Sequence, residues 1–145
     1  MNTLVSAKLS ALGYIAFASS LVAQQQQWTV EYTGANGIHC VDTNMWNAGR
    51  MTTRVQCSRD GQQSNASDSF TIFEVQFDDP TEFTAGTGAV VAWRVKATCR
   101  QGSENSGNCI NHTKNGGGDV EGRSTTAILF GTRDAAMAFL NFFRK

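Results

Sequence analysis

Four cysteines, Cys40, Cys57, Cys99 and Cys109, are the feature that most constrains how this 145-residue chain folds. Paired cysteines are typical of exported proteins, in which disulfides stabilise a small core. Four cysteines can form two disulfides in three ways. We favour Cys40 with Cys57 and Cys99 with Cys109 because both close short local loops. Each disulfide is expected to stabilise the fold by about 2 to 4 kcal/mol. The chain has no CxxC spacing, so the cysteines do not indicate a zinc site, and neither a metal nor a cofactor is predicted.

The N-terminus has the pattern of a secretory signal peptide. Residues 1–23 carry one charge, Lys8, followed by an apolar run from Leu9 to Ala23 that is too short for a membrane span. Cleavage after Ala23 is preferred, with the small residues of Ala16-Phe17-Ala18 as the other candidate. We therefore expect a signal peptide over 1–23, a single secreted domain over 24–145, and no membrane attachment.

The mature chain is close to neutral. Removal of Lys8 leaves 11 basic and 12 acidic side chains, a net charge of −1. That balance disfavours binding to nucleic acid or to an anionic membrane through bulk charge. A chain of 122 residues is long enough for one core, and a monomer is expected.

Five segments alternate in polarity or are rich in β-branched and aromatic residues, which predicts strands. They are Trp28–Thr33, Met51–Cys57, Phe70–Phe77, Val90–Cys99 and Thr125–Phe130. In the third segment, Phe73 is expected to share a face with Val75 and Phe77. Between strands, the pattern predicts a short helical turn from Asp42 or Thr43 through Trp46, and a polar surface loop over Ser58–Ser69.

One helix is predicted, over Arg133–Phe143. Thr132 is suited to the N-cap, and Asp134 suits the positive N-terminal end of the helix dipole. The helix body is apolar almost all round, which favours a core helix; a helix that binds a partner is the alternative. Strands followed by one helix predict an α+β domain, an antiparallel sheet of about five strands covered by the C-terminal helix. A β-sandwich with an appended helix is the alternative fold.

The stretch from Cys99 to Asp119 is the first place to look for a site, because it holds two cysteines, His112 and the glycines 116–118. It also contains a glycosylation sequon, Asn111-His112-Thr113, and a second sequon lies at Asn65-Ala66-Ser67. Asn65 and Asn111 are therefore predicted glycosylation sites. A glycan on Asn111 is expected to crowd any pocket that uses His112.

The chain lacks the nucleophile elbow, Walker loop, zinc-protease motif and dinucleotide fingerprint. An acidic turn at Asp78, Asp79 and Glu82 is interpreted as solvated rather than as a calcium site. One set of residues has usable chemistry: His39, Glu74, Arg94 and His112. Cleavage of a phosphodiester through the 2′-hydroxyl needs a base, an acid and a cation for the growing charge. Glu74 and Arg94 are expected in the middle of neighbouring strands, on one sheet surface.

Short segments around these residues resemble the fungal extracellular ribonucleases and ribotoxins. The segments are Phe73-Glu74-Val75, Arg94-Val95, and His112-Thr113-Lys114 with Gly118-Asp119. The resemblance implies an antiparallel α+β fold that cleaves RNA. It also implies that Glu74 is the general base and His112 the general acid, while Arg94 and His39 hold the phosphate.

Two hypotheses follow. The leading one is a small secreted protein without catalysis, effector-like or toxin-like, of the kind that fungi export to bind a protein of a host or competitor. Its basis is the size, the signal peptide, the paired cysteines and the missing catalytic motifs. The alternative is a secreted ribonuclease-like protein that cleaves or binds RNA through Glu74, Arg94, His112 and His39.

Overall fold

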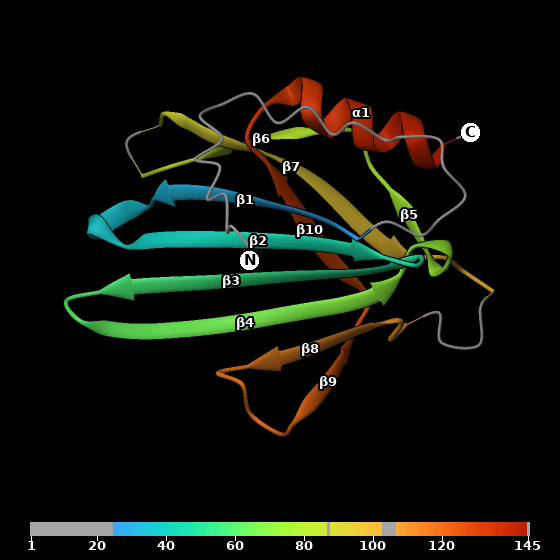
Figure 1. Ribbon diagram of the computed structural model, residues 1–145, viewed down its shortest axis with the longest axis horizontal. Coiled ribbons are helices and arrows are strands. Elements are labelled where there is room, and N and C mark those ends of the chain that lie inside the picture. The colour runs from blue at the N-terminus through green and yellow to red at the C-terminus, as the bar shows by residue number, and fades with distance from the viewer. Residues whose placement is uncertain (1–24, 87, 103–106, 145) are drawn as a thin grey trace, which may run out of the picture.

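The protein consists of two antiparallel sheets and one helix, in a computed structural model that describes residues 25–86, 88–102 and 107–144 (Figure 1). The predicted signal peptide lies outside the described residues. The larger sheet has six strands, in the spatial order β1 (Gln26–Thr33), β2 (His39–Asn47), β3 (Arg50–Arg59), β4 (Gln62–Thr71), β8 (Ile110–Lys114) and β9 (Val120–Arg123). The smaller sheet has four, with β7 (Val90–Cys99) between β10 (Thr125–Phe130) on one side and both β5 (Val75–Phe77) and β6 (Thr81–Thr84) on the other. The helix is α1 (Arg133–Phe143), and two 3-10 turns are η1 (Ala35–Gly37) and η2 (Ile72–Glu74).

Several predicted elements are confirmed. The strands predicted at Trp28–Thr33 and Met51–Cys57 lie within β1 and β3, and those at Val90–Cys99 and Thr125–Phe130 are β7 and β10. The helix has the predicted bounds. Its predicted N-cap is also correct, because the Thr132 hydroxyl accepts a hydrogen bond from the Ala135 N–H at 3.1 Å.

The predicted surface loop Ser58–Ser69 is wrong. Asp60 and Gly61, with φ of 50° and 78°, form a tight turn of the type that joins two strands of a hairpin. The following residues form β4, which pairs with β3 along its whole length. Polar residues on both faces of β4 hide the alternation that would otherwise indicate a strand.

The helical turn predicted to end at Trp46 is also wrong. That segment belongs to β2, which pairs with β1 and β3. The side of the six-stranded sheet that faces the smaller sheet, called the inner face below, receives Asp42 and Asn44 from β2, and both are buried. Since these buried positions are polar, hydrophobic periodicity does not mark the strand.

The predicted strand Phe70–Phe77 is interrupted. Phe70 and Thr71 end β4 in the six-stranded sheet, η2 turns the chain, and β5 then joins the four-stranded sheet by pairing with β7. The expected single sheet of about five strands is therefore replaced by two sheets. The α+β class holds, and the arrangement is closer to the sandwich alternative with its appended helix.

The core lies between the two sheets and under α1. The residues buried in it come from both sheets, η2 and the helix, and they include Met51, Phe70, Ile72, Val95, Ile110, Ile128, Phe130, Ala136, Phe139 and Leu140. Trp28 of β1 stacks on Phe130 with ring centroids 5.4 Å apart, and Phe139 of α1 meets Phe130 and Phe77 at 5.2 Å each. The interpretation of α1 as a core helix is thus confirmed.

Both predicted disulfides are present. Cys40–Cys57 joins facing residues of β2 and β3 within one sheet. Cys99–Cys109 joins the end of β7 to the residue before β8, and so links the two sheets. In the described part of the chain, no helix is long and apolar enough to cross a membrane.

Candidate functional site

A row of polar side chains crosses the inner face of the six-stranded sheet. The pairing register places Asn44, Thr53, Asp68 and His112 side by side on β2, β3, β4 and β8. Three of them, Asn44, Thr53 and His112, are buried, with at most 6% of their surface exposed. Buried polar groups are costly unless they are hydrogen-bonded, so the partners of this row decide what it does.

At the β2 end, the row contacts β10, an edge strand of the smaller sheet. The Asn44 amide donates to Asp42 Oδ1 at 2.7 Å and lies 3.3 Å from the Leu129 carbonyl oxygen of β10. The Trp28 indole N–H donates to the same carbonyl at 3.1 Å. Burial raises the pKa of the Asp42 carboxyl to about 6; the Asn44 hydrogen bond opposes this shift and the charge of Asp68 adds to it. Side chains therefore replace the strand that would otherwise pair with this part of β10.

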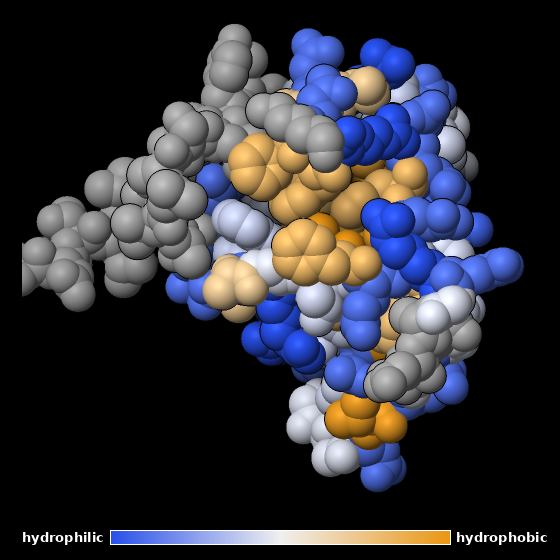
Figure 2. Space-filling view, turned by 90° about the vertical axis from the view of Figure 1, so that its right-hand side faces the viewer, coloured by the Kyte–Doolittle hydropathy of each residue, from blue (hydrophilic) through white to orange (hydrophobic). Residues whose placement is uncertain are grey.

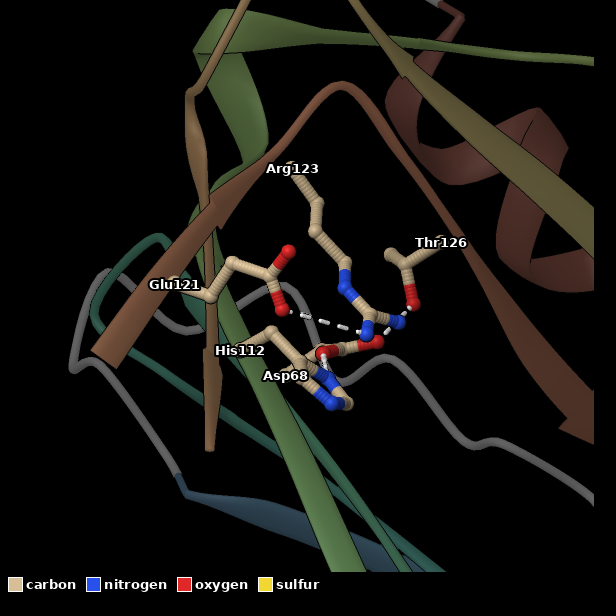
Figure 3. Close-up of polar contacts among 5 residues, drawn as sticks. All are labelled: Asp68, His112, Glu121, Arg123 and Thr126. Carbon is tan, nitrogen blue, oxygen red and sulfur yellow. Dashed lines mark hydrogen bonds and ion pairs between the residues drawn. The ribbon is translucent and has the colours of Figure 1, made fainter. Parts of the chain in front are cut away.

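At the β8 end, Asp68 joins His112 to Thr126 (Figure 3). His112 Nδ1 lies 2.6 Å from Asp68 Oδ1, and the Thr126 hydroxyl donates to Asp68 Oδ2 at 2.5 Å. Since Thr126 belongs to β10, the carboxylate of Asp68 connects the two sheets. With Asp68 ionised, Nδ1 carries the hydrogen, and Nε2 of a neutral ring is the acceptor.

Glu121 and Arg123 of β9 complete this cluster. The Arg123 guanidinium lies 3.5 Å from the Glu121 carboxylate, and Figure 3 shows it pointing toward Asp68 and Thr126. His112 Nε2 is buried and has no hydrogen-bond partner among the described residues. A general base must reach the proton that it removes. In this arrangement Nε2 is enclosed in the core, and the contacts of Asp68 with His112 and Thr126 tie the two sheets together.

The four residues of the ribonuclease hypothesis lie apart. Glu74 is in η2, level with Arg100, the residue that directly follows β7, and its carbonyl accepts from the Arg100 N–H. Arg94 lies six residues earlier on β7, about 20 Å away at the rise of a strand. The expectation that Glu74 and Arg94 share one sheet surface is wrong, because η2 interrupts the strand that was predicted to carry Glu74.

The two histidines lie on opposite faces of the six-stranded sheet. His39 begins β2 on the outer face, 3.8 Å from Glu31, whereas His112 is on the inner face. Arg94 is exposed and lies 6.0 Å from the centre of the Phe83 ring. The structure therefore does not gather the four predicted side chains around one phosphate-sized space.

The predicted glycosylation sites share the outer face. Asn65 and Asn111 have the opposite parity to Asp68 and His112 on β4 and β8, so their side chains point away from the core. A glycan on Asn111 is thus directed away from His112, and the expected crowding is wrong. In the described part of the chain, no three His, Cys, Asp or Glu side chains are placed to hold a metal ion.

A second candidate site lies where α1 ends. Figure 2 shows hydrophobic side chains gathered at this end of the molecule, with hydrophilic ones around them. A hollow of about 590 Å³ there, called the aromatic hollow below, is lined by Ile72, Phe73, Val75, Gln76, Phe77, Arg100, Phe143 and Arg144. Phe73 is 77% exposed, although its neighbour Ile72 is buried. Both residues lie in η2, and the 3-10 turn directs their side chains to different sides. The hydrophobic alternation, which predicted that Phe73 shares a face with Val75 and Phe77, did not indicate this turn.

Two arginines hold the wall of this hollow. Arg100 Nε donates to the Val75 carbonyl at 2.9 Å, and an Arg144 Nη donates to the Phe77 carbonyl at 3.2 Å. Arg144 also binds the Asp79 carboxylate at 2.9 Å. These bonds occupy backbone acceptors of β5 that point away from β7, and they fix the side chains around the hollow.

The chain matches no protein-family model, no curated protein and no solved structure in the comparisons made with it. The resemblance to extracellular ribonucleases therefore depends on its short local motifs alone.

Proposed function

We propose that this is a secreted, effector-like or toxin-like protein that acts outside the cell by binding a protein of a host or competitor, without catalysis. The observation that carries the proposal is Phe73, a large apolar side chain held 77% exposed at the aromatic hollow. An exposed aromatic ring beside a hollow has the character of an interface hot spot. Two disulfides suit an exported protein.

Phe73 is held in place before a partner arrives. The Ile72 N–H donates to the Gly49 carbonyl at 2.9 Å, which ties η2 to the turn between β2 and β3. A Cβ added to Gly49 would lie 3.3 Å from the Phe73 ring, so the ring rests on that turn. A side chain already ordered loses little conformational entropy on binding. Burying it in a partner is worth about 1.5 to 3 kcal/mol.

Site-specific photo-crosslinking tests the proposal. A benzoylphenylalanine replaces Phe73 in one sample and, as the matched control, Val120 in another; Val120 is 62% exposed on β9. Each purified protein is mixed with surface and secreted protein fractions of candidate host or competitor cells and irradiated. We expect one defined adduct from position 73 and none from position 120.

The binding energy is then measured with the partner identified by the crosslink. Phe73→Ala is expected to weaken binding about 10- to 100-fold, and Val120→Ala less than about 2-fold. Equal labelling from both positions, or no adduct from position 73, contradicts the proposal. A crosslink between two copies of the chain would assign the aromatic hollow to self-association and contradict the expected monomer.

A further inference from the structure

The outer face of the six-stranded sheet carries a hollow of about 450 Å³, called the outer hollow below. It is lined by Gln27, Thr43, Met45, Thr52, Arg54, Asn65, Ser67 and Gly116, from four adjacent strands and the turn after β8. Most of these side chains are uncharged hydroxyls and amides, and Arg54 is the one ionised group. Met45 and the threonine methyl groups add apolar surface. Such a lining suits a neutral sugar, which has hydroxyls at its edge and C–H groups on its ring faces.

Asn65 both lines this hollow and begins a sequon. Its backbone is engaged, since Asn65 N–H donates to the Asn115 side chain at 3.2 Å and Asn65 carbonyl accepts from the Asn115 N–H at 2.7 Å. Its side-chain amide has no hydrogen-bond partner among the described residues. Asn111, the other sequon asparagine, is exposed on the same face but is not among the residues that line the hollow.

We propose that Asn65 is N-glycosylated and that the first sugars of this glycan lie in the outer hollow. In the transfer, the amide Nδ2 forms a bond to the anomeric carbon of the first sugar, and the bond from that carbon to the diphosphate of a lipid-linked donor breaks. The amide proton is lost to the transferring enzyme, and the diphosphate leaves with the lipid. Because Asn65 is paired in the folded sheet, the transfer takes place before the chain folds.

The tether makes weak contacts sufficient. A glycan attached to Asn65 is held near the hollow at an effective concentration in the millimolar range. A contact with a dissociation constant of only ~0.1 mM therefore makes the docked glycan about 10-fold more populated than the undocked glycan. The proposal rests on the export part of the proposed function and is independent of Phe73. A bound glycan also covers the outer face and leaves the aromatic hollow accessible.

The test uses the full chain secreted from a eukaryotic host. Intact mass and peptide mapping give the occupancy of each sequon, and an amidase that removes N-glycans is applied to the native protein. We expect glycans at Asn65 and at Asn111, with removal from Asn65 at least about 10-fold slower, as the contact above implies. Denaturation should abolish the difference.

A substitution in the hollow separates docking from simple crowding. Met45→Arg, which fills the hollow, is expected to raise the removal rate at Asn65 toward that at Asn111. Gln63→Arg, exposed on the same face of β4 outside the hollow, should leave the rate unchanged. An exported protein without a glycan on Asn65, or equal native removal rates at both sites, overturns the proposal.

The hollow also has to be distinguished from a receptor for free sugar. Diacetylchitobiose is titrated into the Asn65→Gln protein, and resonances of the outer hollow are followed by NMR. A dissociation constant on the order of 0.1 mM agrees with a tethered occupant, whereas binding weaker than about 1 mM would leave the tethered glycan largely undocked and contradict the proposal. Micromolar binding would assign the hollow to a free ligand and overturn intramolecular docking. None of these outcomes alters crosslinking from position 73, so this proposal and the proposed function fail separately.

Discussion

Neighbouring residues of β8 face different environments, and this decides what each can do. His112 points into the core and binds Asp68, whereas Asn111 and Thr113 point to the outer face, where a glycan has room. A sequon and a candidate catalytic histidine that overlap in the sequence therefore do not compete in space. The same alternation puts His39 on the outer face and Cys40 in the core.

Asp68 is expected to act as a structural link. Asp68→Asn replaces one acceptor oxygen with an amide that cannot accept from His112 or Thr126. We expect the free energy of unfolding to fall by about 1 to 3 kcal/mol, since a buried partner is left unpaired. Urea denaturation measures the change, and Asp119→Asn in the exposed β8–β9 turn is the control. If Asp68→Asn unfolds at the parent's urea midpoint, the link between the sheets is elsewhere.

Asp42 is expected to make stability fall as pH rises. Its pKa is raised by burial from 3.8 to about 6, so the folded protein binds this proton more tightly than the unfolded chain. The stabilising contribution is fully present below pH 3.8 and is lost as pH rises through 6. Asp42→Asn should match the parent near pH 3.5 and exceed its stability at pH 7 by about 1 to 3 kcal/mol.

Urea denaturation of both proteins at pH 3.5, 5, 6 and 7 measures this difference. Curves of stability against pH that run parallel over this range would show that Asp42 keeps an ordinary affinity for its proton in the folded state.

At the scale of elements, hydrophobic alternation identified the strands whose inner positions are mostly apolar. It gave β1, β3, β7 and β10, and the apolar body of α1 with its cap gave the helix. It missed β2 and β4 because their inward-facing positions include the polar residues Asp42, Asn44 and Asp68, which form hydrogen bonds within the fold. It also predicted one continuous strand where β4 ends and β5 begins. The alternation continues through η2, and it carries no information on which sheet a strand joins.

The N-cap of α1 is expected to contribute measurably. Thr132→Ala removes the hydroxyl that accepts from the Ala135 N–H, and the free energy of unfolding should fall by about 1 kcal/mol. Thr132→Ser keeps the acceptor and serves as the control. Thermal or urea denaturation compares the three proteins, and equal stability of Thr132→Ala and Thr132→Ser would mean that the cap does not stabilise the helix.

At the scale of the whole molecule, the two sheets are joined at three kinds of contact. These are the aromatic rings around Phe139, the polar links from Asn44 and Asp68 to β10, and the Cys99–Cys109 disulfide. The disulfide and the rings follow from spacing and hydrophobicity in the sequence. The aromatic hollow could not be predicted in this way. The exposure of Phe73 depends on η2, a turn that forms where the chain passes from one sheet to the other.

Removing the disulfide between the sheets should be costly. The double variant Cys99→Ala, Cys109→Ala opens a loop with a sequence separation of 10 and is expected to lose about 2 to 4 kcal/mol of unfolding free energy. Denaturation under oxidising conditions compares the free energy of unfolding of this variant with that of the parent. Both measurements are repeated with a reductant present. A loss below about 1 kcal/mol would mean that packing alone holds the sheets together.

The side chains that cover strand edges also bear on how the protein behaves when concentrated. Three carbonyls of the smaller sheet point away from β7 and accept hydrogen bonds from side chains. The Leu129 carbonyl of β10 accepts from Trp28 and Asn44. In β5, the Val75 carbonyl accepts from Arg100 and the Phe77 carbonyl from Arg144. An open strand edge is a template on which another chain can add a strand and begin to aggregate. By occupying these acceptors within its own fold, the molecule protects its smaller sheet from that growth while leaving an aromatic ring exposed beside it.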